Sequence, residues 1–261
     1  MQRIFAIVVA AAAGVAALAA NAQEPAVSPV GEWNGVLEVP GQSVRIAIRI
    51  QDAENGVLAG VTGSPDTGNW NVALENVTFA DDALSFDIPT SNGRFEGAWD
   101  AEQSAWVGDY DVAGNTFPLA FNQGPLALPI IEGIDGRWEG TLDVQGVELR
   151  LVFRVYTNEY GTYALMDSPD QLTTGIPVSA VSRDGDAVSF AIAALAGGYE
   201  GTLGETGEAM SGTWSQAGMS FPLDLTRSAI EAVAPNRPQT PQEPFPYTIE
   251  EVSIDNPVDE E

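Results

Sequence analysis

The chain has 261 residues and a net charge of −27, from 37 acidic and 10 basic side chains, with neither histidine nor cysteine. All the basic residues are arginine, so the usual nitrogen and sulfur ligands of transition metals are excluded, as are Ser-His-Asp, Cys-His and Schiff-base catalysis. The acidic balance disfavours nucleic acid and leaves open a cationic partner, a neutral ligand or calcium. Because the carboxylates lack the spacing of a calcium loop, we expect no metal and no cofactor.

Residues 1–22 have the pattern of a secretory signal peptide. Arg3 precedes an apolar stretch from Ile4 to Ala20, and Ala20-Asn21-Ala22 satisfies the rule for a cleavage site. We therefore expect cleavage after Ala22, no membrane span in the mature protein, and a location in the periplasm or outside the cell. An exported chain without cysteine has no disulfides, so its cores must be stable by packing alone.

The remainder of the chain contains the same pattern twice. Trp33-Asn34-Gly35-Val36-Leu37 returns as Trp138-Glu139-Gly140-Thr141-Leu142, and Phe117-Pro118-Leu119 returns as Phe221-Pro222-Leu223. A repeat held in such close register indicates two copies of one small fold. We place copy one at residues 30–123 and copy two at residues 133–227, followed by a proline-rich acidic tail at residues 228–261.

Each copy begins with a predicted β-hairpin. Apolar residues alternate with polar ones from Trp33 to Val39 and from Val44 to Ile50, and copy two repeats this alternation. We predict the register that sets Glu38 opposite Arg45, and Asp143 opposite Arg150 in copy two. In this register the arginines form structural cross-strand pairs with carboxylates.

Short strands follow at regular spacing, and no stretch of the repeats has helical periodicity. Turn pairs such as Asp81-Asp82 and Asp184-Gly185 separate the strands. We predict an all-β protein of two tandem small antiparallel meander barrels, lipocalin-like or avidin-like in appearance, with an extended proline-rich C-terminal tail. A two-sheet sandwich is the alternative for each copy.

The interior of each predicted barrel carries large side chains. An eight-stranded barrel has room for its own side chains, or for one small ligand where the inward residues are small. The many inward aromatic residues favour a filled core, and a ligand-holding calyx is the alternative. The aromatic and aliphatic residues expected inside copy one are Trp33, Ile48, Phe86, Phe95, Trp99, Tyr110 and Phe117.

The motif Ser-Pro-Asp occurs after the third strand of both copies. It comprises Ser64-Pro65-Asp66 in copy one and Ser168-Pro169-Asp170 in copy two, where Gln171 follows. Proline fixes a turn, and serine and aspartate side chains accept hydrogen bonds from nearby backbone amides. A structural turn is the first interpretation, and a polar rim at the barrel mouth is the second. The candidate binding residues are Ser64, Asp66, Ser168, Asp170 and Gln171; we predict no catalytic residue.

Copy two and the tail carry a family resemblance. The segments concerned include Gly136-Arg137-Trp138-Glu139-Gly140, Gly198-Tyr199-Glu200-Gly201 and the linker from Arg237 to Tyr247. They resemble the N-terminal β-module and linker of exported bacterial α/β hydrolases of the serine hydrolase or dienelactone-hydrolase-like type. The resemblance implies that the serine nucleophile, acid and histidine lie in a downstream catalytic domain, and this chain has no G-x-S-x-G motif.

Two functional hypotheses follow. In the first, the chain is an exported noncatalytic accessory module of an α/β hydrolase, from a truncated or split hydrolase gene or as a separate protein. In the second, it is a periplasmic protein of lipocalin-like type that binds a small apolar ligand. The expected partner is accordingly a hydrolase domain or a small apolar molecule, and any enzymatic activity belongs to an associated domain.

Overall fold

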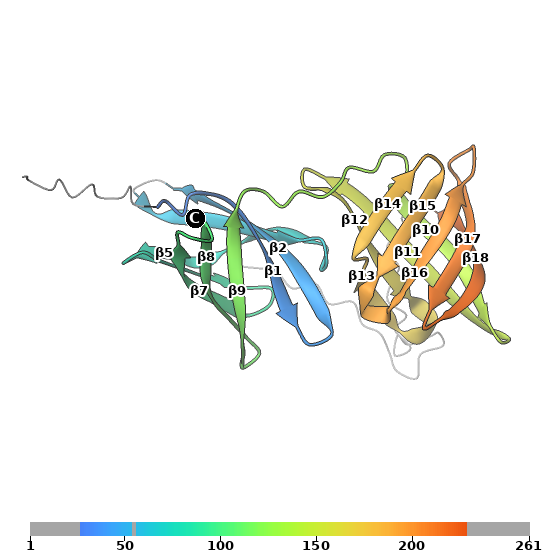
Figure 1. The fold of residues 1–261 in the computed structure, drawn as a ribbon, viewed down its shortest axis with the longest axis horizontal. Coiled ribbons are helices and arrows are strands. Elements are labelled where there is room, and N and C mark those ends of the chain that lie inside the picture. Colours follow the sequence, from blue (N-terminus) through green and yellow to red (C-terminus); the bar gives the residue numbers. More distant parts are fainter. Residues whose placement is uncertain (1–26, 54–55, 229–261) are drawn as a thin grey trace, which may run out of the picture. The chain divides into compact units, whose positions relative to one another are not determined.

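The structure is a computed structural model that describes residues 27–53 and 56–228, and the structural statements below concern these residues. The predicted signal peptide and the tail from residue 229 lie outside the described residues. The described chain is built almost entirely of β-strands, which confirms the all-β fold class (Figure 1). No helix in these residues is long and apolar enough to cross a membrane.

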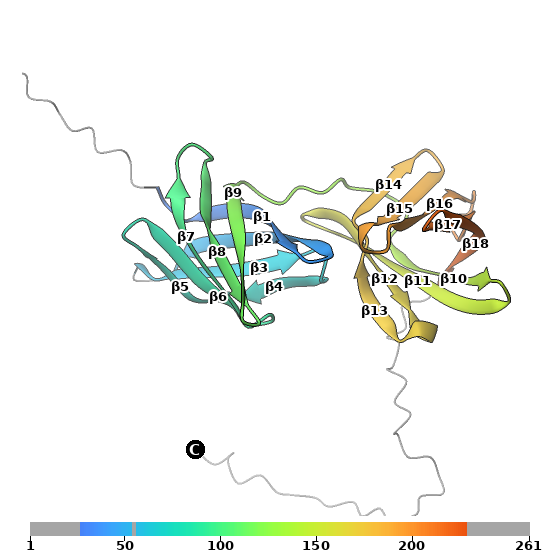
Figure 2. The ribbon, with the colours of Figure 1, turned by 60° about the horizontal axis from the view of Figure 1, so that its bottom comes forward.

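Copy one forms one nine-stranded antiparallel sheet with the order β4-β3-β2-β1-β9-β8-β7-β6-β5. Because each copy forms one sheet rather than two, the sandwich alternative is wrong and the meander barrel is confirmed (Figure 2). The strands of copy one are β1 (Gly31–Val39), β2 (Gln42–Asp52), β3 (Leu58–Ser64), β4 (Asn69–Ala73), β5 (Glu75–Ala80), β6 (Ala83–Ile88), β7 (Gly93–Asp100), β8 (Ala105–Val112) and β9 (Asn115–Gln123).

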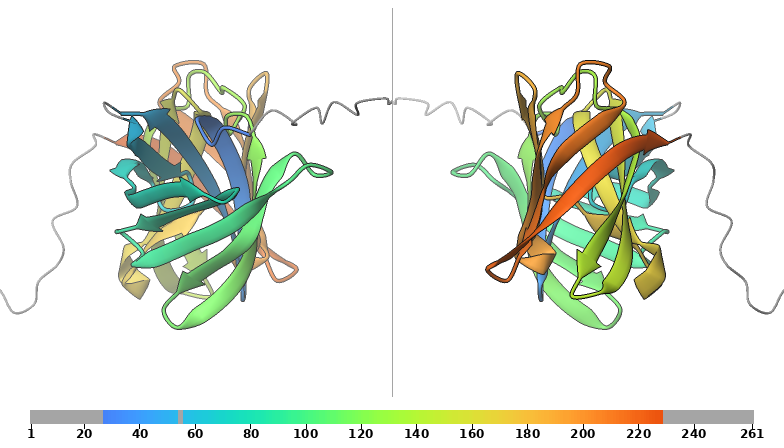
Figure 3. Two further views of the ribbon diagram at one scale, coloured as in Figure 1. Left: turned by 90° about the vertical axis from the view of Figure 1, so that its left-hand side faces the viewer. Right: turned by 90° about the vertical axis from the view of Figure 1, so that its right-hand side faces the viewer.

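Copy two repeats this arrangement in the order β13-β12-β11-β10-β18-β17-β16-β15-β14, with strongly twisted strands (Figure 3). Its elements are β10 (Gly136–Val144), β11 (Val147–Asn158), β12 (Gly161–Ser168), η2 (Pro169–Gln171), β13 (Thr173–Pro177), β14 (Ala180–Asp184), β15 (Ala187–Ile192), η3 (Ala193–Leu195), β16 (Gly197–Leu203), β17 (Ala209–Gln216) and β18 (Met219–Ser228).

Each sheet curves until its first and last strands pair. In copy one, β1 pairs with β9 through Trp33 opposite Gln123 and Gly35 opposite Phe121. The remaining edges, β4 and β5, are joined by Leu74, so the chain changes its pairing partner from β3 to β6 at this residue. The Leu74 amide donates to the Gly60 carbonyl at 2.9 Å, which fixes the kink. The result is an up-and-down barrel of the kind found in lipocalins.

The register of the first hairpin differs from the prediction. Val36 lies opposite Arg45 and Glu38 lies opposite Ser43, so the predicted Glu38–Arg45 pair is wrong. The cause is the two-residue turn, in which Pro40 precedes Gly41, whose φ is 86°. Proline suits the first central position of such a turn, and glycine suits the second, so the turn residues set the register.

The corresponding hairpin of copy two departs from its predicted register in the same way. Gln145 and Gly146 both have positive φ, at 56° and 86°, as a two-residue hairpin turn requires. Arg150 therefore lies opposite Thr141, and the predicted pairing with Asp143 is wrong. Because the pairing is displaced by an even number of residues in both copies, every side chain keeps its predicted face.

Each barrel has its own hydrophobic core. Trp99 and Phe117, predicted to be inside copy one, are only partly buried, whereas Trp106 is fully buried and was not predicted there. The largest buried side chains are Trp33, Phe86, Phe95, Trp106 and Phe121 in copy one, and Trp138, Phe153, Phe190 and Tyr199 in copy two. Burial of each such side chain contributes about 1.5–3 kcal/mol, which supports packing as the source of stability without disulfides.

Paired glycines allow two strands of each barrel to approach closely. Gly97 lies opposite Gly108 in copy one, and Gly201 lies opposite Gly212 in copy two. A Cβ atom on Gly108 would lie 2.1 Å from the Glu96 carbonyl oxygen, and one on Gly212 would lie 2.3 Å from that of Glu200. No other residue fits these positions without backbone movement, which explains why both copies carry the pair.

Candidate ligand-binding site

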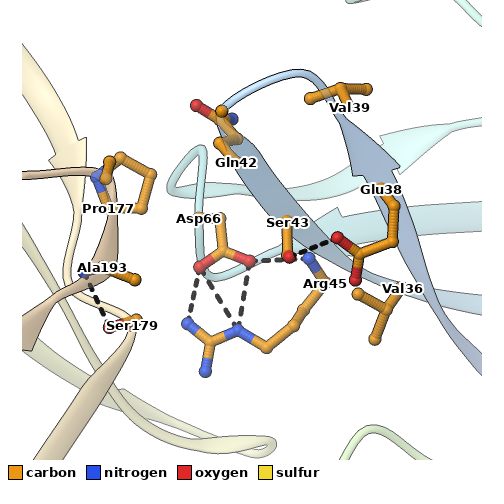
Figure 4. Close-up of a pocket in the computed structure, with 12 residues that line it drawn as sticks. Val36, Glu38, Val39, Gln42, Ser43, Arg45, Asp66, Pro177, Ser179 and Ala193 are labelled. Carbon is orange, nitrogen blue, oxygen red and sulfur yellow. Dashed lines mark hydrogen bonds and ion pairs between the residues drawn. The ribbon is translucent and has the colours of Figure 1, made fainter. Parts of the chain in front are cut away.

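The Ser-Pro-Asp loop of copy one is held by a buried ion pair. Asp66, which is 4% exposed, accepts a hydrogen bond from the Arg45 amide at 2.6 Å. Its Oδ1 atom lies 2.5 Å from Arg45 Nη2. Figure 4 draws this ion pair as dashed lines. The Ser64 hydroxyl in turn accepts a hydrogen bond from the Asp66 amide at 3.2 Å. These bonds fasten the loop between β3 and β4 to the neighbouring strand β2.

The loop of copy two keeps only part of this arrangement. Asp170 accepts a hydrogen bond from the Arg150 amide at 2.7 Å, as Asp66 does from the Arg45 amide. Unlike Asp66, however, Asp170 is exposed. Ser168 donates to the side-chain oxygen of Gln171 at 2.9 Å. The backbone contact common to both copies supports the structural interpretation of the motif.

Copy two has an ion pair that the sequence did not indicate. Arg154 binds both oxygens of Asp167, each at 2.8 Å, and Asp167 also accepts the Gly175 amide at 2.7 Å. Copy one has Gly63 in place of Asp167, so no equivalent pair can form there. The exchange of Gly63 for Asp167 between the two copies was the sequence signal from which this ion pair could have been predicted.

One end of the first barrel contains a cavity of about 230 Å³. We call this end the mouth of the first barrel; it is formed by the turns at residues 40–41, 65–68, 89–92 and 113–114. Apolar residues of the core form the cavity floor, and exposed residues such as Thr67, Asn69 and Thr90 form its rim. The lining residues are Leu37, Val44, Ile46, Thr62, Gly63, Ser64, Thr67, Asn69, Val72, Ile88, Thr90, Ser91, Tyr110 and Val112.

A pair of hydroxyl groups lies at this mouth. The Tyr110 hydroxyl lies 2.6 Å from Ser91 Oγ, and Ser91 Oγ lies 3.2 Å from the Ile88 carbonyl oxygen. The Tyr110 ring is 3% exposed and fits because residue 93 is glycine: a Cβ there would lie 2.1 Å from the Tyr110 hydroxyl. Burial raises the pKa of Tyr110, so the hydroxyl keeps its proton at neutral pH.

Two further polar lining groups already make hydrogen bonds within the protein. The Thr62 hydroxyl donates to the Ala47 carbonyl oxygen at 3.0 Å, and the Ser64 hydroxyl accepts the Asp66 amide. No lining residue carries a formal charge at neutral pH. The cavity is therefore suited to an uncharged molecule, because a charge buried without a partner costs several kcal/mol.

The same end of the second barrel carries larger apolar side chains. Met166, Leu195 and Trp214 stand where copy one has Thr62, Ser91 and Tyr110. Met166 and Trp214 are buried in the core of copy two, and the partly buried Leu195 packs against this core. The substitutions fill positions that line the cavity in copy one, so the two copies differ at the feature that makes a ligand site.

The predicted site residues lie in different places and have different contacts in the structure. Ser64 lines the cavity, whereas Asp66 holds the adjacent loop. Ser168, Asp170 and Gln171 lie at the corresponding end of copy two. Tyr110 and Ser91 were missed as site residues, although the exchange of Ser91 for Leu195 between the copies was a usable signal. Among the described residues, no cluster of acidic side chains is placed to hold a metal ion.

Comparison with known proteins gives only distant structural similarity. No family model and no curated protein match the chain. Its structure is similar to a protein of unknown function of the DUF3598 family from Nostoc punctiforme PCC 73102, with 9% identity, coverage of 77% of this chain and 96% of that chain, and a TM-score of 0.26. It is also similar to kievitone hydratase from Nectria haematococca, with 11% identity, coverage of 77% and 90%, and a TM-score of 0.20. At these scores neither structure is a basis for assigning a function.

Proposed function

We propose that this protein is an exported binding protein that holds a small, mostly apolar molecule in the mouth of the first barrel. The observation that supports this function is the cavity of about 230 Å³ at one end of a barrel that is otherwise filled. An apolar protein cavity of about 150 Å³ is large enough for benzene. The cavity therefore has room for a molecule with one ring or a short chain.

The test is to fill the cavity with the side chains that copy two carries. The double variant T62M/S91L introduces methionine and leucine where copy two has Met166 and Leu195, so the fold has already accommodated both in its other copy. We expect wild-type protein to bind at least one of toluene, 4-methylphenol and 1-hexanol saturably, by ligand-observed NMR and calorimetry. Binding to T62M/S91L should be at least about tenfold weaker, since the added side chains occupy the site.

The matched control is S211L/T213M, which makes the same two chemical changes at exposed positions of β17 in copy two. This control should bind like the wild type. Absence of saturable binding at millimolar concentrations of all three compounds, or equal binding by the wild type and T62M/S91L, would contradict the proposal.

A second candidate, the accessory module of an α/β hydrolase, is supported by the sequence resemblance and by one surface feature. Copy two exposes Val147, Leu172 and Met219, at 59%, 88% and 52%, in or directly after the turns at one end of its barrel. Copy one has Gln42, Gly68 and Asn115 at the equivalent positions. Exposed apolar residues that gather at one end are typical of a protein contact.

This second candidate is tested with a purified α/β hydrolase domain encoded beside the gene. Sedimentation should show a complex with the wild-type chain and none with V147Q/L172G/M219N, which restores the residues of copy one. Complex formation that is insensitive to these changes, or no complex at all, would remove the support for this candidate.

A further inference from the structure

We infer that the ligand of the first barrel is a neutral molecule that donates a hydrogen bond, of the alcohol or phenol class, to the Ser91–Tyr110 pair. The inference rests on the proposed binding function and names its ligand class. It follows from the acceptor lone pairs that remain on this pair of hydroxyl groups, from the absence of charge in the lining and from the size of the cavity.

The hydroxyl pair has two protons and two internal acceptors. Ser91 donates to the Ile88 carbonyl oxygen, so the Tyr110 hydroxyl donates to Ser91 Oγ at 2.6 Å. Both protons are then used, and each hydroxyl oxygen still has a lone pair that can accept a hydrogen bond. A ligand that enters this mouth can therefore donate a hydrogen bond from an O–H or N–H group to the Ser91 or Tyr110 hydroxyl oxygen.

A ligand group that only accepts hydrogen bonds is disfavoured beside the Ser91–Tyr110 pair for the same reason. A ketone, ether or ester oxygen beside this pair would face the lone pairs of both hydroxyl oxygens. Only if Ser91 gives up its hydrogen bond to the Ile88 carbonyl oxygen does a proton become free for such a ligand. The Thr62 hydroxyl does not relieve this, because it already donates to the Ala47 carbonyl oxygen. The Ser64 hydroxyl accepts a hydrogen bond from the Asp66 amide and keeps its own proton, so an acceptor group of a ligand that also reaches Ser64 has a donor there. Leaving a buried polar atom without a partner lowers affinity.

Charged ligands are disfavoured for two separate reasons. Carboxylates, including fatty acids, are acceptors without a proton and approach a chain with a net charge of −27. Ammonium groups are attracted by that net charge, but the cavity lining has no carboxylate to pair with them. Neutral molecules are the remaining class, and those with an O–H group can donate to the Ser91–Tyr110 pair.

The experiment measures, by calorimetry, the affinities of 4-methylphenol, toluene, 4-methylanisole and 4-methylbenzoate for the full-length mature protein. The useful quantity is the ratio of two ligand affinities on one protein, because it cancels changes in the shape of the cavity. In Y110F, the ratio of 4-methylphenol to toluene should fall about fivefold from its wild-type value, with toluene binding unchanged. We expect no binding of 4-methylbenzoate by the wild type.

A second variant inverts the preference. In S91A the Tyr110 proton loses its acceptor and becomes free to donate to a ligand. The ratio of 4-methylanisole to toluene should therefore rise about fivefold in S91A, which a merely structural role of Ser91 would not cause. Unfolding midpoints of both variants verify that they are folded.

The outcomes separate the ligand class from the binding function. Toluene and 4-methylphenol binding with an unchanged ratio in Y110F, or preferential binding of 4-methylbenzoate, would overturn the ligand class while the binding function stands. Failure of every compound to bind the wild type would overturn the proposed function itself. Retention of the full wild-type pattern by T62M/S91L would place the binding site elsewhere and overturn both.

Discussion

Tyr199 shows at the scale of one residue how the two copies differ in their cores. Its side chain is fully buried, and its hydroxyl has no hydrogen-bond partner among the described residues. Copy one has Phe95 at the equivalent position, with Gly97 beneath the ring as Gly201 lies beneath the Tyr199 ring. An unsatisfied buried hydroxyl costs about 1–3 kcal/mol, so copy two includes a local cost that copy one avoids.

We predict that Y199F raises the free energy of unfolding by about 1 kcal/mol. Phenylalanine removes the unpaired hydroxyl and keeps the ring that packs on Phe153 and Phe190. Urea unfolding followed by tryptophan fluorescence measures the change, and F95Y is the reciprocal control, which should lower stability. A loss of stability in Y199F would show that the hydroxyl has a favourable partner.

The same residue predicts a dependence on alkaline pH. Burial, and to a lesser extent the charge of Asp224, raises the pKa of Tyr199. Above about pH 10 the unfolded tyrosine ionises while the folded one keeps its proton, so unfolding releases protons and stability falls as pH rises. The Y199F variant should lose less stability between pH 9 and pH 11, on the order of one pKa unit's worth, about 1.4 kcal/mol. Identical pH profiles would contradict this.

At the scale of elements, the Ser-Pro-Asp loops allow one motif to be compared in two settings. Asp66 is buried and binds both the amide and the guanidinium of Arg45, whereas Asp170 is exposed and accepts the Arg150 amide. We predict that D66A lowers the free energy of unfolding by about 2–3 kcal/mol, and D170A by about 0.5–1 kcal/mol. Calorimetric unfolding measures both. Equal losses would mean that burial and the ion pair add nothing to the backbone contact.

The sequence predicts the elements well where a pattern repeats along the chain. Alternation from Trp33 to Val39 shows which side chains face inward, and duplication shows that the pattern is one fold formed twice. The register was wrong because the prediction favoured charge pairs such as Glu38 with Arg45, whereas the turn at Pro40-Gly41 determines the pairing. Turn geometry is a stronger constraint on register than one exposed ion pair.

The candidate site was less predictable than the fold, because a cavity depends on packing rather than on periodicity. Ser64 was identified through its motif, and it does line the cavity. Tyr110 was predicted only as a core residue, and Ser91 was not predicted at all, since inward aromatics favoured a filled barrel. The volume left at the mouth follows from which side chains meet there, and a single alternating sequence does not contain that information.

At the scale of the whole molecule, the two copies share one fold but differ at the residues that line the cavity. Both barrels have a close-packed core, and at the corresponding end one has small polar residues while the other has large apolar ones. The second barrel is therefore an internal control for the first, since it shares the fold and lacks the lining of the cavity. The net charge of −27 disfavours anionic ligands for the entire chain.

The most direct test of ligand binding in the first barrel is a crystal structure of residues 23–261 with 4-bromophenol, in which the anomalous signal of bromine locates the ligand. We expect one strong anomalous peak per chain at the mouth of the first barrel, with the phenol oxygen within hydrogen-bonding distance of Tyr110 or Ser91. A peak within the second barrel instead, or the absence of any peak in the first barrel at saturating ligand, would contradict it.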